Sequence, residues 1–244
     1  MRALNITEHK TNLTNILIDI YKDPLLGSIL GFKGGTAAML FYNLPRFSVD
    51  LDFDLLVKYG KDSDELKSLI EKMTELLSKK YIIKDQSMKY NTLFWLVSYG
   101  DSLANIKVEI STRNIPYNHY TLTSFYGVNV KVIDVGDMIS HKMIALMDRR
   151  ITANRDLFDV HYFLGISYVN DINYDIIKDR TGKDPLDFYK DLYEFVNNIN
   201  SSTILNGLGE VLDQGQKDWV KAKLKIELLG LIERHIENYS VPSV

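Results

Sequence analysis

Two short motifs near the N-terminus combine residue types that bind phosphate with residue types that bind a divalent cation. The first is Gly34-Gly35-Thr36, which follows an apolar segment and begins a run of helix-forming residues that Pro45 ends. The two glycines are therefore expected at a helix N-terminus, where glycine allows positive φ and unpaired backbone N–H groups favour an anion. We expect a triphosphate to bind at this turn.

The second motif begins thirteen residues after Thr36, where residues 49–55 alternate strictly between apolar and acidic side chains. This period predicts a strand with Asp50, Asp52 and Asp54 on one face. Three carboxylates on one face repel each other unless a cation lies between them, and Mg²⁺ is usually held by one or two carboxylates together with nucleotide phosphates. We expect Asp50 and Asp52 to be metal ligands, whereas Asp54 would support them or face solvent.

The order and spacing of these motifs are similar to the signature of the polymerase-β-like nucleotidyltransferase superfamily. Within that superfamily the sequence resembles the AbiEii/AbiGii toxin family. The segments that carry the resemblance are residues 32–36, 46–53, 142–149 and 155–160. The resemblance implies a polymerase-β-like domain with a mixed sheet, an NTP substrate, and Mg²⁺ as a cofactor that Mn²⁺ can replace.

Sites of this superfamily use a third carboxylate on a neighbouring strand, and Glu109 fits that place. Residues 105–111 alternate so that Glu109 would lie on the polar face, beside Asp50 and Asp52 if the two strands pair. We therefore expect Glu109 to be a third metal ligand. The alternative is that Glu109 belongs to an exposed Lys-x-Glu pair on an amphipathic strand.

The resemblance also implies further contacts to the nucleotide. Lys33 directly precedes the glycines, and Arg46 and Ser48 directly precede the acidic strand. We expect all three to contact the nucleotide, although Arg46 and Ser48 could instead only shape the beginning of the strand.

More polar residues lie in the C-terminal half of the chain. Lys142 and Arg149 are two helical turns apart, so they would form a basic stripe that binds phosphate oxygens. Arg149, Arg155 and Asp156 could instead form ion pairs that hold two helices together. Lys142 and Asp159 match later motifs of the family and are expected to act in catalysis.

The composition is that of an ordinary globular protein, with 244 residues, 45% of them hydrophobic and 25% charged, and a net charge of −3. No apolar run approaches eighteen residues and the N-terminus lacks a signal-like segment, so we expect a cytoplasmic protein without a membrane partner. The absence of cysteine excludes disulfides and thiolate zinc sites. The histidines have no metal-ligand spacing and are expected to be structural or surface residues: His9, His119, His141, His161 and His235.

The periodicity of the sequence changes near residue 137, which predicts two domains. Residues 1–136 would form the α/β (α+β) nucleotidyltransferase domain, and residues 137–244 a helical domain. In the first domain, strands are expected at residues 81–83, 92–97, 106–110 and 126–135, with a helix at 63–79. In the second, helices are expected at residues 138–147, 155–164, 184–196 and 216–239.

These features predict transfer of NMP from an NTP to an acceptor hydroxyl, with release of pyrophosphate. The family resemblance implies a toxin of a toxin–antitoxin or phage-abortive-infection system, with a cognate antitoxin encoded nearby and the 3′ end of tRNA as acceptor. Alternatives are a small-molecule nucleotidyltransferase of the antibiotic-modifying type, a protein AMPylator, and a non-catalytic NTP-binding regulator. The presence of Asp50, Asp52 and Glu109 disfavours the regulator, because a degenerate site usually loses a ligand.

Overall fold

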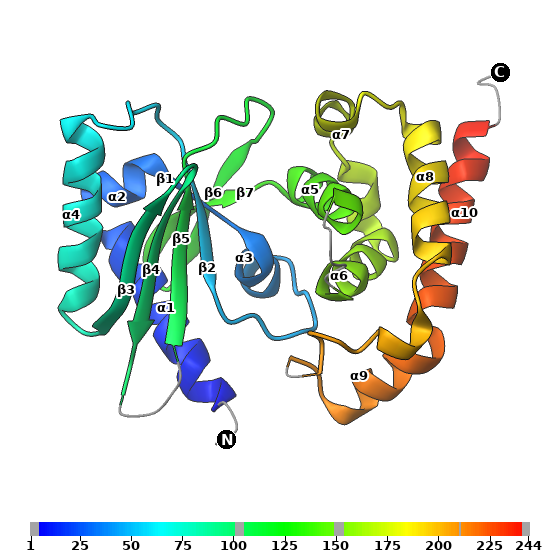
Figure 1. Cartoon of the computed structure of the whole chain (residues 1–244), viewed down its shortest axis with the longest axis horizontal. Helices are drawn as coiled ribbons and strands as arrows, with labels where there is room; N and C mark the ends of the chain where they lie inside the picture. Colours follow the sequence, from blue (N-terminus) through cyan, green and yellow to red (C-terminus); the bar gives the residue numbers. More distant parts are fainter. Residues whose placement is uncertain (1–4, 101–104, 149–153, 210, 241–244) are drawn as a thin grey trace. The chain divides into compact units, whose positions relative to one another are not determined.

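The computed structural model describes residues 5–100, 105–148, 154–209 and 211–240. The chain divides into two compact units, Met1–Ile133 and Asp134–Val244. The first unit combines a sheet with helices, and the described part of the second contains helices and turns (Figure 1). The domain boundary expected from the sequence, after residue 136, lies three residues beyond the limit of the first unit.

The first unit is built around one sheet. Its helices are α1 (Ile6–Lys22), α2 (Pro24–Ile29), α3 (Gly34–Phe41) and α4 (Asp64–Ser78). Its strands are β1 (Leu30–Lys33), β2 (Leu51–Leu55), β3 (Ile82–Lys89), β4 (Thr92–Ser98), β5 (Asn105–Ser111), β6 (Tyr120–Phe125) and β7 (Val128–Ile133).

The sheet has seven strands in the order β3-β4-β5-β2-β1-β7-β6. The β2–β5 and β1–β7 pairs are parallel and the other pairs are antiparallel, which confirms the expected mixed α/β fold. One expected strand, residues 126–135, is wrong in its extent. Tyr126 and Gly127 both have positive φ and form the turn of a hairpin, so β6 precedes them, β7 follows, and the next helix begins at Val135.

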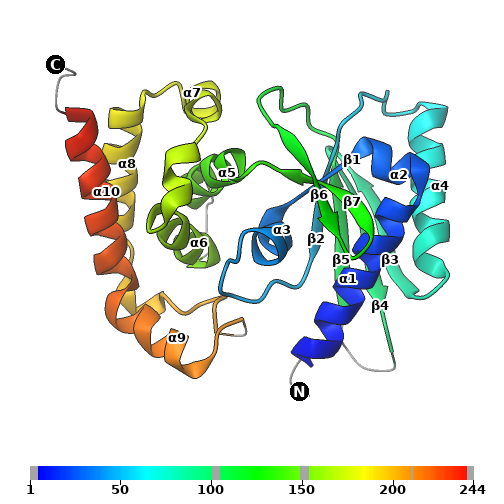
Figure 2. The same ribbon diagram turned by 180° about the vertical axis from the view of Figure 1, so that it is seen from behind.

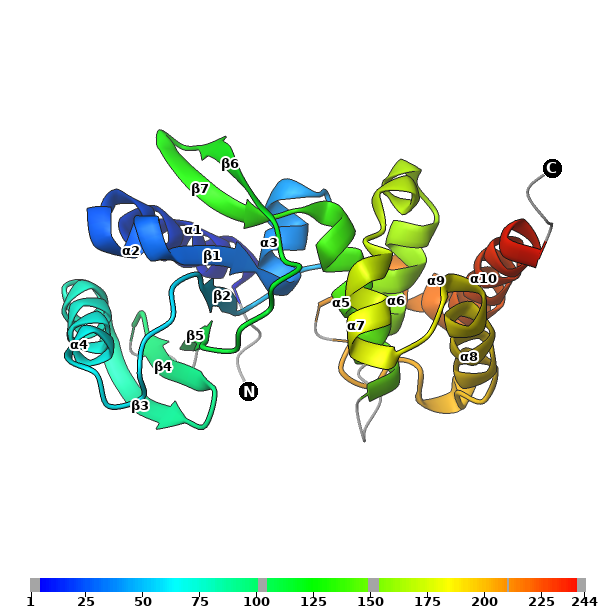
Figure 3. The same ribbon diagram turned by 90° about the horizontal axis from the view of Figure 1, so that it is seen from above.

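The alternation of the strands gives the sheet one apolar face. On that face the rings of Phe32 and Phe53 lie 5.3 Å apart, and Tyr21 of α1 packs against Phe53. At β4 the Trp95 indole donates a hydrogen bond to the Thr74 hydroxyl of α4, over 2.9 Å. Helices α1, α2 and α4 lie together beside the strands in Figure 3, and Figure 2 shows α1 from the opposite side. The opposite face of β2 and β5 is polar.

Helix α4 illustrates how the sequence specifies these helices. Ser63 caps its N-terminus by accepting a hydrogen bond from the backbone N–H of Leu66. Apolar residues then recur at helical spacing and are buried: Leu66, Leu69, Met73 and Leu77. The expected helix at residues 63–79 is therefore present.

The second unit contains a series of helices. They are α5 (Val135–Asp148), α6 (Asn154–Leu164), the 3₁₀ turn η1 (Ser167–Asp171), α7 (Tyr174–Thr181), α8 (Pro185–Asn197), the 3₁₀ turn η2 (Ser201–Thr203), α9 (Gln214–Trp219), the π-helical turn η3 (Val220–Leu224) and α10 (Lys225–Ser240). Helices α8 and α10 pack along each other (Figure 1). The helix expected at residues 216–239 is interrupted, because η3 separates α9 from α10. Within the described ranges, no helix has the length and apolarity needed to cross a bilayer.

Candidate active site

The register of three neighbouring strands brings the predicted acidic residues onto one row of the polar face. Asp52 of β2 is the register partner of Lys33 on β1 and of Glu109 on β5. Directly opposed residues point to the same face of a sheet, so the carboxylates of Asp52 and Glu109 project side by side from adjacent parallel strands. The structure thus joins two of the three predicted metal ligands through strand pairing.

The glycine turn lies against the same aspartate. Gly34 has φ +79°, and a Cβ built on it would lie 2.3 Å from Oδ2 of Asp52. Only glycine fits here, because a side chain would be strained by the backbone and would collide with the carboxylate. The close approach places the first turn of α3 directly beside the acidic strand.

The residues that precede β2 also contact the glycine turn. A Cβ on Gly35 would lie 2.8 Å from Oγ of Ser48 and 3.1 Å from Nη2 of Arg46. The hydroxyl of Thr36 donates a hydrogen bond to the backbone carbonyl of Asp50 and is hydrogen-bonded at 3.0 Å with the Ser48 hydroxyl. These buried contacts join the first turn of α3 to the beginning of β2 and bring a guanidinium beside Gly35.

Asp50 lies one residue before β2 and next to β5. Its Oδ1 accepts a hydrogen bond of 3.4 Å from the backbone N–H of Lys107, and its Oδ2 lies 3.8 Å from the Lys107 ammonium. The Lys107 side chain is half exposed, so this ion pair contributes little to stability. Its effect is to orient the Asp50 carboxylate toward β5.

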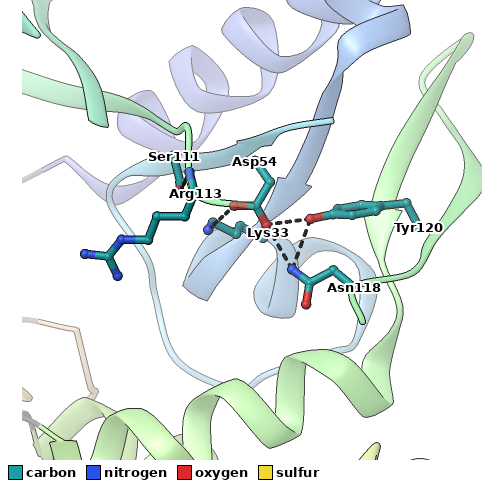
Figure 4. A network of polar contacts seen from close by, with 6 residues as sticks. All are labelled: Lys33, Asp54, Ser111, Arg113, Asn118 and Tyr120. Atoms are coloured by element: carbon teal, nitrogen blue, oxygen red, sulfur yellow. Dashed lines mark hydrogen bonds and ion pairs between the residues drawn. The ribbon is translucent and has the colours of Figure 1, made fainter. Parts of the chain in front are cut away.

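The third aspartate, Asp54, is buried and surrounded by hydrogen-bond donors (Figure 4). The alternative expectation that Asp54 faces solvent is therefore wrong. The Lys33 ammonium lies 2.5 Å from Oδ1 of Asp54. Tyr120 donates to Oδ2 at 2.5 Å and Asn118 donates to the same oxygen at 3.1 Å. Lys33, predicted to contact the nucleotide, therefore has its ammonium on Asp54.

Tyr120 reaches Asp54 because Gly31 leaves room for its ring. A Cβ on Gly31 would lie 2.3 Å from Cε1 of Tyr120. Burial, and then the charge of Asp54, raise the pKa of Tyr120 well above its ordinary value. Tyr120 therefore remains protonated and donates its hydrogen bond at all physiological pH values.

The carboxylates of Asp50, Asp52 and Glu109 suit a hard cation that is bound at the same time by the phosphates of a nucleotide. In the described part of the chain, no group of three or more Asp, Glu or His side chains is arranged to hold a metal ion by protein atoms alone. Mg²⁺ is commonly bound by one or two carboxylates together with substrate phosphates and water. Asp52 and Glu109 on one polar face, beside a helix N-terminus and with Asp50 held next to β5, fit that mode of binding.

Two predicted site residues of the second unit form a buried ion pair. The Lys142 ammonium of α5 contacts Oδ2 of Asp159 on α6, and Asp159 is completely buried. Arg149, which was expected to extend the basic stripe from Lys142, lies outside the described residues. Asp156 is buried on the first turn of α6 and Arg155 lies beside it.

Comparison with known proteins identifies the family. The profile described as "Nucleotidyl transferase AbiEii toxin, Type IV TA system" matches residues 16–230. The chain belongs to the AbiEii nucleotidyltransferase toxin family. This membership makes the protein a nucleotidyltransferase of a type IV toxin–antitoxin system.

Two crystal structures share the fold of this AbiEii protein. A candidate nucleotidyltransferase from H. pylori is 22% identical, with a TM-score of 0.63 and 98% of each chain covered. JHP933 from Helicobacter pylori is 21% identical, with a TM-score of 0.62, and the match covers 98% of this chain and 95% of that one. No curated protein matches the sequence.

Sequence reasoning missed the residues that hold the AbiEii motifs from a distance. Asn118 and Tyr120 bind Asp54 across more than sixty positions of sequence. His9 of α1 binds the backbone carbonyl of Val49. The one local signal was Gly31, since an isolated glycine in a strand indicates close approach by another group.

The glycine turn can be tested by Gly34→Ala. We expect the free energy of unfolding to fall by about 1–2 kcal/mol from the left-handed backbone alone, and nucleotidyl transfer to be lost because Asp52 must move. Urea unfolding and a transfer assay measure the two effects. Gly230→Ala is the control, because its added Cβ would meet nothing within 4 Å and α10 should be as stable or more so. Equal stability and activity of both variants would contradict the close approach.

The Asp54 network can be tested by Tyr120→Phe. Loss of a hydrogen bond to a buried carboxylate should lower the free energy of unfolding by about 1.5–3 kcal/mol. Urea unfolding should show no such change for Tyr126→Phe, since Tyr126 is exposed. If Tyr120→Phe lowers the free energy of unfolding no more than Tyr126→Phe does, the network is excluded.

The ion pair of the second unit can be tested by Lys142→Met. This change leaves Asp159 buried without its ammonium partner and should cost about 3–5 kcal/mol of unfolding free energy. The double variant Lys142→Met/Asp159→Leu should recover much of that loss. Lys178→Met is the control, because its pair with Asp184 is exposed and should contribute less than about 1 kcal/mol. Failure of the second substitution to restore stability would refute the pairing.

Proposed function

We propose that this protein transfers NMP from an NTP to the 3′ end of tRNA in a Mg²⁺-dependent reaction. The observation that carries the proposal is the pairing of Asp52 with Glu109 on one face, with Gly34 in contact with the Asp52 carboxylate. This arrangement puts cation ligands and an anion-binding helix terminus within reach of one triphosphate.

The backbone of α3 would bind the phosphates. Gly34 and Gly35 are the first residues of the helix, and Lys33 at the N-cap supplies no side-chain hydrogen bond to the helix terminus. The first backbone N–H groups of α3 and the positive end of its dipole would attract phosphate oxygens. The Arg46 guanidinium beside Gly35 adds positive charge at the same place.

Asp50, Asp52 and Glu109 would hold Mg²⁺. Bound there, Mg²⁺ would lower the pKa of the attacking hydroxyl and offset the charge that develops on the phosphates. The carboxylates themselves repel the triphosphate, so they orient the nucleotide only through a shared cation. The anchored beginning of β2 would keep Asp50 and Asp52 fixed during the reaction.

The proposed reaction breaks a phosphoanhydride bond of the NTP and forms a phosphodiester bond to the acceptor. The acceptor oxygen forms a bond to the α-phosphorus and loses its proton to solvent. The bond from the α-phosphorus to the bridging oxygen breaks, and pyrophosphate leaves with that electron pair. Lys142 and Asp159 are proposed to assist transfer, as the family's later motifs imply.

Family membership supports a biological setting for this reaction. We propose that the protein is a cytoplasmic toxin acting in phage defence, countered by a cognate antitoxin encoded nearby. Modification of the tRNA acceptor end would halt translation and so arrest growth.

The proposal is tested by Asp52→Asn, with labelled NTPs, Mg²⁺ and total tRNA. The wild-type protein should label tRNA and arrest growth when expressed in bacteria. The variant should transfer more than about a hundredfold more slowly, because loss of a metal ligand should cost more than loss of a group that only orients one, which costs about 10–100-fold. Glu71→Gln removes an exposed carboxylate on α4 and should behave as wild type.

Other outcomes would change the conclusion. Labelling of protein or of a small molecule in place of tRNA would refute the tRNA acceptor and favour an AMPylator or an antibiotic-type transferase. Unchanged transfer in Asp52→Asn would refute the metal site. No turnover with either Mg²⁺ or Mn²⁺ would favour an NTP-binding regulator.

A further inference from the structure

A buried histidine contacts the backbone immediately before the acidic motif. His9 of α1 is 1% exposed, and both of its ring nitrogens have partners. Nε2 lies 2.9 Å from the carbonyl oxygen of Val49, and Nδ1 lies 2.6 Å from the Tyr99 hydroxyl. The residue after Val49 is Asp50, a proposed metal ligand.

The partners of His9 fix its protonation. A carbonyl oxygen only accepts, so Nε2 must carry a proton and donate it to Val49. Burial, the largest effect, lowers the pKa of His9, while the Val49 hydrogen bond and the Asp50 charge oppose that shift. The ring is therefore neutral at physiological pH, and its Nδ1 accepts a hydrogen bond from Tyr99.

The segment held by His9 precedes the regular ladder of β2. Residues 46–50 are neither helix nor strand. Two side chains from different helices bind consecutive carbonyls there: His9 of α1 binds Val49, and Thr36 of α3 binds Asp50. Together they fix the peptide from which the Asp50 side chain projects.

We propose that His9 is a positioning residue that, through the Val49 carbonyl, orients the Asp50 carboxylate for binding a divalent cation. This inference rests on the proposed function, in which Asp50 is a metal ligand. The competing interpretation is purely structural, because His9 also packs edge-on against Phe47 and Tyr99 at 5.7 and 5.5 Å between ring centroids. The two interpretations differ in whether metal affinity changes when only the hydrogen bond to Val49 is lost.

A matched pair of variants separates the two hydrogen bonds of the ring. The amide nitrogen of Gln extends about as far as Nε2 and can still donate to Val49. The amide nitrogen of Asn replaces Nδ1, so it can reach Tyr99 but not Val49. Both variants replace the ring with the same polar group and differ in which partner they keep.

The measurement is Mn²⁺ binding to the full chain in complex with an NTP analogue that cannot be cleaved between its α- and β-phosphates, by electron paramagnetic resonance, because the carboxylates share the proposed cation with phosphates. We expect His9→Asn to bind Mn²⁺ about tenfold more weakly than wild type, in the range known for groups that orient metal ligands. His9→Gln should stay within about threefold of wild type. The Mg²⁺ concentration for half-maximal transfer should rise in the same order, with the KM for NTP unchanged.

Two results would overturn the inference: equal Mn²⁺ affinity in wild type and His9→Asn, or equal losses in His9→Asn and His9→Gln. If His9→Asn does not fold, His9→Phe replaces it, since a phenyl ring keeps the packing and removes the donor. Its Mn²⁺ affinity must then fall about tenfold for the inference to stand. Asp50→Asn separately tests the premise that Asp50 is a metal ligand. If this variant binds Mn²⁺ as tightly as wild type, the metal role of Asp50 is refuted, whereas the contact of His9 with Val49 is not.

Discussion

The structure depends on holding two carboxylates side by side on adjacent strands. Asp52 and Glu109 share one row of the sheet. Neighbouring strands lie about 4.8 Å apart, and two like charges at that separation repel by roughly 3 kcal/mol at an effective dielectric constant of 20. The apolar face of the same strands opposes this repulsion. Leu51, Phe53 and Val108 are completely buried there, and a register shift of one residue would expose them. The hydrophobic core therefore enforces the acidic row.

This constraint explains why the motifs could be predicted from the sequence. Strict alternation through Asp50, Asp52 and Asp54 determined which face carried the acids, and a glycine pair before helix-forming residues located the turn. Both signals are local. The place of Glu109 beside Asp52 needed the additional expectation that two strands pair, and that pairing is present in parallel register.

The contacts that hold these motifs could not be predicted in the same way. Asp54 looks like the other two aspartates in the sequence, and its contacts with Lys33 and with the distant Asn118 and Tyr120 make it a buried anchor. The hairpin that presents Tyr120 was missed, because an uninterrupted strand was expected across Tyr126 and Gly127. Positive φ at a tyrosine has no strong sequence signature, whereas tertiary contacts can impose it.

The residues before β2 show how an irregular segment can be held as firmly as a strand. A ladder fixes a strand through repeated backbone hydrogen bonds, but residues 46–50 are held by side chains of neighbouring elements. Such contacts fix one backbone conformation without requiring φ and ψ of the β region. The beginning of the acidic motif can thus turn toward α3 and still present Asp50 next to β5. Regular strand pairing positions Asp52 and Glu109, whereas tertiary side-chain contacts position Asp50, so the three acids depend on different parts of the fold.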